Sequence, residues 1–557
     1  MKQLQRLYHQ HLPSDRYTTP EFAQRLAAIS TELNQPVCVY INRRGQIVRV
    51  GVGSPLQTQI PPLELPRYGA SRLSGIRCLA TQLKAQPPKE ASLTSMAIQR
   101  LDALVVLNLT GTGAIRKGKG AVGYVAQTYT AHLIPQTDPN LDLDSLHKSL
   151  WVISSPLTLE ILCQQDFLEL VEGLEAEFER EYQGQTVAKG QDQVFLVGLM
   201  TDDTSESEFQ RSLTELTRLV ETAGGKVLAS YRQKRSRPHP QTVVGSGKVA
   251  EIALQVQTLG ANLIVFDRDL TPAQVRNLET RIGIRIVDRT EVILDIFAQR
   301  AQSRAGKLQV ELAQLEYMLP RLLGRGEAMS RLGGGIGTRG PGETKLETER
   351  RGIGKRIARL QREVNQLQAH RSRLRQQRQQ QEIPSIAIVG YTNAGKSTLI
   401  NALTNAEVYA ADQLFATLDP TTRRLSVPHA VTGEPINALL TDTVGFIQEL
   451  PPSLVDAFRA TLEEVTEADA LLHVVDLSHP AWQSQIRSVM QILGEMPMSP
   501  GPMLIVFNKI ELVSNEVLAE AMQEHPLAIF ISAQKRQGLA NLREKLGELI
   551  HYAMADS

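Results

Sequence analysis

The chain has 557 residues, of which 42% are hydrophobic, and 60 basic side chains nearly balance 59 acidic ones to leave a net charge of +1. This composition is ordinary for a globular protein and predicts three or four domains of roughly 150 residues. The three scattered cysteines exclude a disulfide framework and a cysteine metal cluster. The sequence has no run of 18 apolar residues, so no membrane span is expected. Without an apolar signal core at the start, we expect a cytoplasmic protein.

Residues 1–190 have the pattern of an α+β extension. Apolar and polar residues alternate over Pro36–Val52 around a glycine, which predicts a hairpin, and Leu101–Leu109 predicts a buried strand. Residues 167–183 predict an acidic amphipathic helix. The loop GTGAIRKGKG at 111–120 lacks the third glycine and the following helix of a dinucleotide site, so a basic loop is favoured.

Strands and helices alternate over residues 191–300. Val194–Met200, Leu263–Phe266 and Ile284–Asp288 predict strands, and residues 206–222 and 271–281 predict helices between them. This alternation is typical of an α/β domain with a parallel sheet.

Residues 301–382 predict a helical hairpin. Leucines at 308, 312, 315, 319 and 322 follow a 4-3-4-3 spacing, and apolar residues from Ile353 to Leu374 repeat it. Between the two stripes lies a glycine-rich loop with six glycines in residues 333–342. Such a loop has little tendency to be helical.

The second helix of this hairpin is basic, with eleven lysines and arginines against four acidic residues over 345–382. A solvated helix face would explain the charge. Arginine outnumbers lysine nine to two, however, and its planar fork suits phosphate, which favours RNA. The candidate RNA contacts are Arg339, Arg350, Arg351, Arg356 and Arg359.

The most specific chemistry begins after the strand Ser385–Val389. The residues that follow form a G-x-x-x-x-G-K-S phosphate loop before an apolar helix. They are Gly390, Tyr391, Thr392, Asn393, Ala394, Gly395, Lys396 and Ser397. Backbone N–H groups would surround the β-phosphate, Lys396 would reach the β- and γ-phosphates, and Ser397 would bind Mg²⁺.

Two further segments suit nucleotide-dependent switches. A D-x-x-G sequence ends a strand at Asp442, Thr443, Val444 and Gly445, where Asp442 would lie near Mg²⁺ and the Gly445 N–H would sense the γ-phosphate. The loop Phe415, Ala416, Thr417, Leu418 and Asp419 would supply a threonine to Mg²⁺. Thr417, Thr421 and Thr422 all remain candidates on spacing alone.

The nucleotide base is expected to be guanine. Asn508, Lys509, Ile510 and Glu511 follow a strand in the form N-K-x-E, where N-K-x-D is usual, so the carboxylate is kept with one extra methylene. Ser532, Ala533 and Gln534 would reach guanine O6 through their backbone. Phe446 stands where a water-orienting glutamine is common, which predicts slow intrinsic hydrolysis; Gln448 is a nearby alternative.

These motifs together resemble the HflX-type GTPases over about residues 191–551. The matching segments include VVGSGKVAE (243–251), VFDRDLTPAQVRNLE (265–279), GGGIGTRGPGETKLETERR (333–351) and LFATLDPTTR (414–423). The patterns and the resemblance together predict a multidomain α/β protein with four parts, of which the resemblance covers the last three. These are an extension (1–190), an α/β domain (191–300), a hairpin (301–382) and a P-loop GTPase domain with a mixed, mostly parallel sheet (384–551).

The resemblance also implies a function. A GTPase of this kind would bind the rRNA of the large ribosomal subunit as a monomer and split stalled ribosomes under stress. It would use Mg²⁺ held by Ser397 and Thr417, with Lys396, Thr417 and Gly445 as the catalytic residues. Some members are credited with ATP binding in the N-terminal domain, for which Gly245–Lys248 is a candidate, although a structural turn is favoured there.

Two other hypotheses stay open. The first is an ATP-driven RNA-remodelling protein acting through residues 191–330, although the sequence has no helicase-type motifs. The second is a scaffold whose residues 1–190 recruit a protein or a peripheral membrane partner. Neither requires stable insertion into a membrane.

Overall fold

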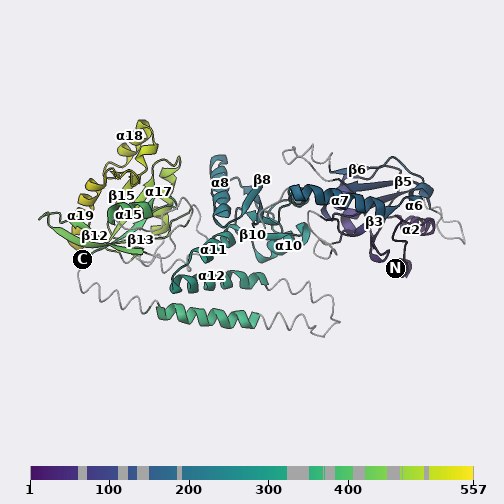
Figure 1. Ribbon diagram of the computed structural model, residues 1–557, viewed down its shortest axis with the longest axis horizontal. Helices are drawn as coiled ribbons and strands as arrows, with labels where there is room; N and C mark the ends of the chain where they lie inside the picture. The colour runs from purple at the N-terminus through teal and green to yellow at the C-terminus, as the bar shows by residue number, and fades with distance from the viewer. Residues whose placement is uncertain are drawn as a thin grey trace. The chain divides into compact units, whose positions relative to one another are not determined.

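The computed structural model describes residues 2–60, 65, 72–110, 123–134, 150–184, 191–322, 350–367, 369, 383–404, 415, 421–447, 465–466, 468–494 and 501–555. Three β-sheets, each joined to its own helices, make up this part of the chain (Figure 1). The basic loop predicted at 111–120 and the glycine-rich loop at 333–342 lie outside the described residues.

The first sheet has six strands in the order β2-β1-β3-β4-β5-β6. Only β3 and β4 run parallel, and the other neighbours are antiparallel. The predicted hairpin forms with Gly45 at φ +81°, where a Cβ would lie 1.8 Å from the Leu12 carbonyl oxygen. The elements are α1 (Lys2–Leu7), α2 (Pro20–Leu33), β1 (Val37–Asn42), β2 (Ile47–Val52), α3 (Pro55–Thr58), β3 (Ile76–Gln82), α4 (Glu90–Ile98), β4 (Ala103–Thr110), β5 (Tyr124–Leu133), β6 (Trp151–Ile153), α6 (Leu159–Gln164) and α7 (Phe167–Gly184).

The core of this first part contains a buried arginine. Arg77 of β3 donates to the carbonyl oxygens of Tyr17 and Pro13, and its guanidinium lies 4.6 Å from the centre of the Phe167 ring. Burial lowers the pKa of Arg77 to about 10. The backbone carbonyls and the ring replace water around the cation, which is why a charged side chain can occupy this core.

The second sheet has four strands in the order β10-β9-β7-β8, and β7 and β8 are parallel as predicted. A capping box of Ser205 and Glu208 begins α8 at the predicted residue. The elements are β7 (Gln193–Met200), α8 (Glu206–Thr222), β8 (Lys226–Lys234), α9 (Ser246–Leu259), β9 (Leu263–Phe266), α10 (Pro272–Ile282), β10 (Arg285–Asp288) and α11 (Arg289–Arg300).

Helix α9 packs against the N-terminal extension. Leu254 belongs to the same buried cluster as the first sheet, and the Gln257 side chain donates to the carbonyl oxygen of Ile98 at the end of α4. Residues 1–184 and α9 therefore share a core, so the extension is not connected through its linker alone.

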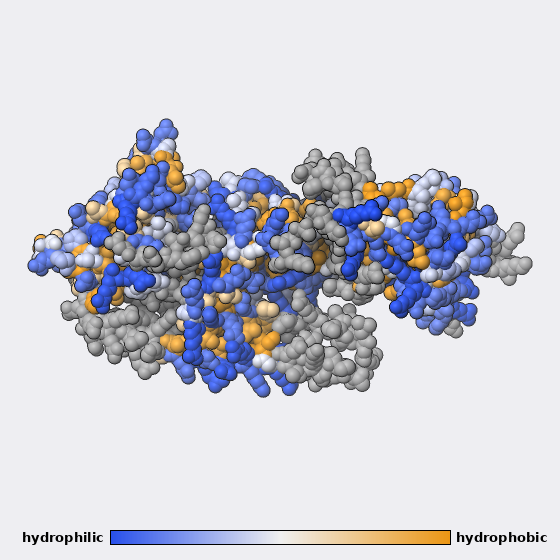
Figure 2. Space-filling view, in the orientation of Figure 1, coloured by the Kyte–Doolittle hydropathy of each residue, from blue (hydrophilic) through white to orange (hydrophobic). Residues whose placement is uncertain are grey.

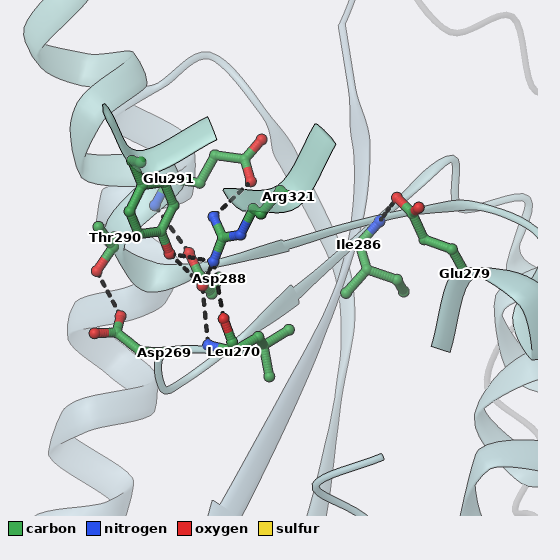
Figure 3. A network of polar contacts seen from close by, with 9 residues as sticks. Asp269, Leu270, Glu279, Ile286, Asp288, Thr290, Glu291 and Arg321 are labelled. Atoms are coloured by element: carbon green, nitrogen blue, oxygen red, sulfur yellow. Dashed lines mark hydrogen bonds and ion pairs between the residues drawn. The ribbon is translucent and has the colours of Figure 1, made fainter. Parts of the chain in front are cut away.

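A polar network joins helix α12 (Arg304–Leu322) to α11 (Figure 3). The Asp288 carboxylate caps α11 by accepting from the Glu291 N–H at 3.0 Å, and it also accepts from the Leu270 N–H. Arg321 and Tyr317 of α12 donate to the same carboxylate. One buried acid thus fixes the start of α11 and the direction of α12.

Helix α12 and the helix at residues 350–367 form the predicted hairpin. Leu312, Leu360 and Val364 are buried together, with Leu308, Leu315 and Ile357 beside them. In the space-filling view, hydrophobic residues gather between these helices and hydrophilic residues follow the outer edge of the second one (Figure 2).

The third sheet has six strands in the order β12-β13-β11-β14-β15-β16. Only β12 runs antiparallel to its neighbour, so the predicted mixed, mostly parallel sheet is confirmed. The elements are β11 (Ser385–Val389), α15 (Lys396–Thr404), β12 (Thr421–Pro428), β13 (Pro435–Asp442), β14 (Ala470–Asp476), α17 (Trp482–Gly494), β15 (Met503–Asn508), η2 (Ile510–Leu512), α18 (Asn515–Glu524), β16 (Ile529–Phe530) and α19 (Leu539–Ala555).

The contacts divide the chain into two compact units. One contains residues 1–203, 226–265 and 273–286, and the other contains 204–225, 266–272 and 287–557. The four predicted domain boundaries stay a prediction. Among the described residues, no helix is both long and apolar enough to cross a membrane.

Candidate functional site

A tight loop connects β11 to α15 at the centre of the third sheet. Gly390 has φ +148° and Gly395 has φ +90°, conformations that L side chains rarely adopt. A Cβ on Gly390 would lie 2.1 Å from the Val474 carbonyl oxygen, and one on Gly395 would lie 2.3 Å from the Asn508 amide nitrogen. The backbone conformation and the crowding both require glycine, so the predicted phosphate loop has its expected shape.

Lys396 is folded back into this loop. Its Nζ donates to the carbonyl oxygens of Gly390 at 3.0 Å and Tyr391 at 2.8 Å, and its side chain is buried. Burial lowers the pKa of Lys396 to about 8, while the charge of Asp442 opposes that shift. A polyanion in the loop would compensate this buried cation better than two carbonyl dipoles do.

Ser397 and Asp442 meet beside the loop. The parallel pairing of β11 and β13 sets Asp442 opposite Ile388, and the Ser397 hydroxyl donates to Asp442 Oδ2 at 2.7 Å. A hydroxyl and a carboxylate together supply the hard oxygen donors that Mg²⁺ prefers. The residues present therefore fit a magnesium ion, which would be held by Ser397 directly and by Asp442 nearby.

Backbone hydrogen bonds hold the segment after β13 against the phosphate loop. Phe446 donates its N–H to the Gly390 carbonyl oxygen and accepts from the Thr392 N–H. Its side chain is buried with Tyr391 and Val389. A Cβ on Gly445 would lie 2.7 Å from Thr392 Cα and 2.9 Å from Lys396 Nζ, so no side chain fits there. The Phe446 side chain thus belongs to the core and offers no hydrogen-bonding group to the loop.

Asn508 links three parts of the nucleotide site. Its Nδ2 donates to the Ala394 carbonyl oxygen at 2.9 Å, and its Oδ1 accepts from the Ala533 N–H at 2.9 Å. The predicted phosphate loop and the predicted loop at 532–534 are therefore joined through a buried amide. Ser532 is buried too, whereas Gln534 is exposed.

Lys509 and Glu511 flank the position expected for the base. Lys509 has φ +63°, and its Nζ forms an ion pair with Asp476 Oδ2 at 2.7 Å. One carboxylate oxygen of Glu511 is buried and has no hydrogen-bond partner among the described residues. A buried acceptor without a partner is costly, and a guanine ring offers two N–H donors of the kind that it lacks.

Some predicted residues cannot be placed. Ala416, Thr417, Leu418, Asp419 and Gln448 lie outside the described residues. Phe415 is described, with φ +55° and a buried ring that contacts Phe297 of α11 edge-on at 4.8 Å between ring centres. Of the other predicted members of the nucleotide site, Thr443 and Val444 directly follow β13, and Ile510 begins η2.

Two residues near this site were not predicted from the sequence. Asp476, at the end of β14, orients Lys509, and the pattern of a buried strand ending in an acid could have identified it. His473 on the same strand is almost fully buried, and its Nδ1 has no hydrogen-bond partner among the described residues. Burial, and then the charge of Lys396, lower the pKa of His473 to about 4, so it is neutral.

Three family models match successive parts of the chain. They are described as "GTP-binding GTPase N-terminal" over residues 210–298, "GTP-binding GTPase Middle Region" over 300–378 and "50S ribosome-binding GTPase" over 385–509.

Curated relatives match across the same region. "GTPase HflX" of Alkalihalophilus pseudofirmus is 47% identical over 64% of this chain and 82% of its own length. "GTPase HflX" of Escherichia coli is 46% identical over 62% of this chain and 80% of its own length. The chain belongs to the HflX family of GTPases.

Membership of the HflX family confirms the resemblance, the P-loop GTPase fold and the activity: the chain is a GTP-hydrolysing enzyme. Among solved structures, a GTP-binding protein from Sulfolobus solfataricus in complex with GDP is 27% identical, over 66% of this chain and 100% of that chain, with a TM-score of 0.34.

In the second helix of the hairpin, residues 350–367, only some of the arginine side chains are free to contact a partner. Arg350, Arg351 and Arg359 are exposed, and Arg359 forms an ion pair with Glu363 at 2.9 Å. Arg356 donates two hydrogen bonds to Glu311 of α12, which ties the two helices together. Arg339 lies outside the described residues. These RNA contacts stay a prediction.

The Gly245–Lys248 turn does not have the geometry of a phosphate loop. Gly245 has φ −64°, and its N–H donates to the Gln233 side chain. Lys248 forms an ion pair with Glu251 at 2.6 Å. The structure and the comparisons give no support to ATP binding here; Gly245 is the N-cap of α9, and Ser246, Gly247 and Lys248 form its first turn.

Proposed function

We propose that this HflX-family GTPase binds the large ribosomal subunit and separates stalled ribosomes under stress, with the nucleotide state as the switch. The observation that carries the proposal is the match of residues 385–509 to a family described as a 50S ribosome-binding GTPase. The protein would act in the cytoplasm and would bind ribosomes as a monomer.

The hairpin supports an RNA contact. Arg350 and Lys355 of the second helix are exposed and have no ion-pair partner among the described residues. The apolar stripe of that helix faces α12, so its charged side is left for another molecule. Phosphate groups of rRNA would complement such a surface, and the contact would weaken as salt is raised.

The nucleotide site supports GTP turnover by positioning and charge. Lys396 would leave the loop carbonyls and bind the β- and γ-phosphates, and the Gly445 N–H would donate to the γ-phosphate. Ser397 and Thr417 would hold Mg²⁺, which supplies positive charge to the phosphate oxygens when bound. Glu511 would accept from the guanine ring, while the backbone at 532–534 would meet guanine O6.

Slow hydrolysis in the free protein follows from Phe446. Its buried ring cannot orient a water molecule, and no glutamine occupies that position. Stimulation by the large subunit would therefore come from better placement of groups already in the protein or from a group on the ribosome.

Ribosome-dependent GTP turnover tests the proposal. Turnover of the full-length protein would rise strongly with large subunits and little with small subunits, and Lys396→Ala would stay near background in both. Light scattering of 70S ribosomes would fall with GTP and not with GDP. An unchanged turnover rate in the presence of large subunits would refute the proposal.

A charge-matched pair of variants tests the hairpin. Removing the charges of Arg350 and Lys355 should weaken subunit binding, whereas Arg6→Ala and Arg25→Ala, two exposed arginines of the extension, should leave it unchanged. Equal effects from both pairs would contradict a specific role for the hairpin.

A further inference from the structure

The residue expected to recognise the base differs from the usual motif in length and not in charge. Glu511 takes the place of the aspartate in N-K-x-D, which puts the carboxylate one methylene further from the backbone. An aspartate of this motif pairs with two neighbouring donors of guanine, the ring N1–H and the 2-amino group. The effect of the longer side chain therefore depends on whether the backbone can move to compensate for it.

Hydrogen bonds hold the backbone around Glu511 in place. The Leu512 N–H donates to the Lys509 carbonyl oxygen at 3.0 Å. The Ile510 N–H donates to the Ile531 carbonyl oxygen at 3.3 Å, and the Lys509 side chain is held by its ion pair at the end of β14. Because this turn is fixed to its neighbours on both sides, the extra methylene displaces the carboxylate and not the backbone.

The two carboxylate oxygens of Glu511 have different surroundings. Oε2 is buried and accepts no hydrogen bond from a described residue. Oε1 is not enclosed in this way, and the residue as a whole is half-buried. A carboxylate that binds two donors side by side must present both of its oxygens to them. With one oxygen enclosed and the other open to solvent, Glu511 presents a single acceptor to the base.

The loop expected to meet O6 does not distinguish guanine from hypoxanthine. Ser532 and Gln537 exchange two backbone hydrogen bonds, and the Ala533 N–H donates to Asn508, so the loop is held in one shape. Guanine and hypoxanthine share O6 and the ring N1–H, and they differ only in the 2-amino group. Discrimination between them therefore requires an acceptor for that group, which the site would leave unpaired with hypoxanthine.

We propose that this GTPase also accepts inosine nucleotides as substrates, because Glu511 accepts from the ring N1–H alone and leaves the 2-amino group without a protein acceptor. The proposal rests on the proposed function only for the base contact of Glu511, and not for ribosome binding. Adenine nucleotides stay excluded, since adenine has no hydrogen on N1 and carries an amino group in place of O6.

The reaction with ITP is the same as with GTP. Water attacks the γ-phosphorus, the bond from that phosphorus to the β–γ bridging oxygen breaks, and IDP, inorganic phosphate and one proton are released. The base takes part in no step, so bound ITP should be hydrolysed at the rate of bound GTP.

A simple exchange of one acid for another is the alternative explanation of Glu511. A side chain that folds back on binding would bring both oxygens to the base and recognise guanine as fully as an aspartate does. The two explanations differ in one measurable quantity, the ratio of the dissociation constants for IDP and GDP.

The test uses the full-length protein without ribosomes. Competition against a fluorescent GDP analogue gives the dissociation constants of GDP, IDP and ADP for the wild type, Glu511→Asp and the control Glu516→Asp. Glu516 is exposed in the first turn of α18, so the control shortens a nearby acid by the same methylene. Thermal unfolding and single-turnover hydrolysis of GTP and ITP are measured for the same three proteins.

The wild type and Glu516→Asp should bind IDP within about threefold of GDP, because water replaces the missing acceptor for the 2-amino group. Glu511→Asp should bind GDP more tightly than IDP by about tenfold or more, as expected for a hydrogen bond to a charged group. ADP should bind weakly to all three proteins, and all three should have the same melting temperature.

Three outcomes would overturn the proposal. They are a wild-type preference for GDP over IDP of about tenfold or more, an equal preference in Glu511→Asp and the wild type, and bound ITP that is not hydrolysed. If Glu511→Asp also leaves both affinities unchanged, Glu511 does not contact the base, and that part of the proposed function fails as well. Ribosome-stimulated GTP turnover is measured in parallel. If it is absent while IDP still binds as well as GDP, ribosome binding fails and the inosine proposal stands.

Discussion

The Asn508 side chain donates to the Ala394 carbonyl oxygen at 2.9 Å and so connects β15 directly to the phosphate loop. The same amide accepts from the Ala533 N–H. Both partners are backbone groups of the two loops that are predicted to bind the nucleotide. The shape of the site therefore depends on the Asn508 side chain, for which the motif alone predicts only recognition of the base.

Asn508→Ala should therefore weaken guanine nucleotide binding, because it removes both hydrogen bonds that hold the two loops together. Two buried hydrogen bonds contribute about 1–3 kcal/mol together, which corresponds to about a five- to 150-fold loss of affinity. Titration with a fluorescent GDP analogue measures it. Asn515→Ala, at the first turn of α18, is the control and should bind normally. Wild-type affinity in Asn508→Ala would show that the two loops hold their shape without the amide.

The relative positions of these loops could be expected from the sequence because each motif in a P-loop domain is local. β11, the glycines and the end of β13 are each determined by a few consecutive residues, and the structure brings Lys396, Ser397 and Asp442 together as the motifs require. The links made by Asn508 and by Asp476 could not be predicted, since each joins residues that are distant in sequence.

The extension was harder to predict for a different reason. Arg77 is fully buried, and a charged residue in a strand pattern favours an exposed position. Its partners are backbone carbonyls of Pro13 and Tyr17, which carry no signal in the sequence. The hydrogen bond from Gln257 of α9 to the carbonyl oxygen of Ile98 in α4 also has a backbone acceptor, so the sequence carries no signal for it either.

Nucleotide affinity should depend on pH through Lys396. Burial holds its pKa at about 8 in the free protein, and bound phosphates favour the protonated form. Binding therefore takes up a proton above pH 8 and none below it. Affinity for GDP should be constant up to about pH 8 and then fall, by up to about tenfold per pH unit.

Titrations at pH 7, 8 and 9 measure this dependence. Lys396→Met should bind weakly at every pH and show no such fall, because the titrating group is gone. An unchanged affinity of the wild type from pH 7 to pH 9 would mean that Lys396 is fully protonated throughout this range in the free protein.

Glu511→Ala should weaken binding of guanine nucleotides and leave binding of adenine nucleotides as weak as before. The buried carboxylate oxygen of Glu511 has no partner among the described residues, and the guanine N–H groups would satisfy it. Loss of a charged hydrogen bond costs about 1.5–3 kcal/mol, or about ten- to 150-fold in affinity. Competition between GTP and ATP for the fluorescent analogue gives the ratio.

The matched control for Glu511 is Glu516→Ala in the first turn of α18. It removes the same charge a short distance along the chain and should keep the wild-type preference for GTP over ATP. If Glu511→Ala still prefers GTP to ATP as strongly as the wild type, another group reads the base.

The stability of the helical hairpin should depend more on the apolar residues between its helices than on the ion pair of Arg356 with Glu311. Leu360 is fully buried between the helices, and Leu→Ala substitutions of this kind cost about 2–5 kcal/mol. The side chains of Arg356 and Glu311 are 42% and 40% exposed, so water screens their attraction. Hydrogen exchange of residues 350–367 should accelerate strongly in Leu360→Ala and little in Arg356→Ala. The opposite order would make the ion pair the main link.

Phe446→Gln should not accelerate GTP hydrolysis, although it restores the residue type that orients water in other GTPases. The Phe446 side chain is 3% exposed and packs with Tyr391 and Val389 below the phosphate loop. A glutamine there would bury an amide without partners, so the melting temperature should fall and turnover should stay equal or decrease.

Phe446→Leu is the control, because it keeps an apolar side chain in the same core and should retain both stability and basal turnover. Single-turnover hydrolysis without ribosomes is the measurement, together with thermal unfolding of each variant. A faster reaction in Phe446→Gln at unchanged stability would show that residue 446 reaches the attacking water. The slow hydrolysis that we expect of the free enzyme would then be explained by the residue type at 446 and not by its burial.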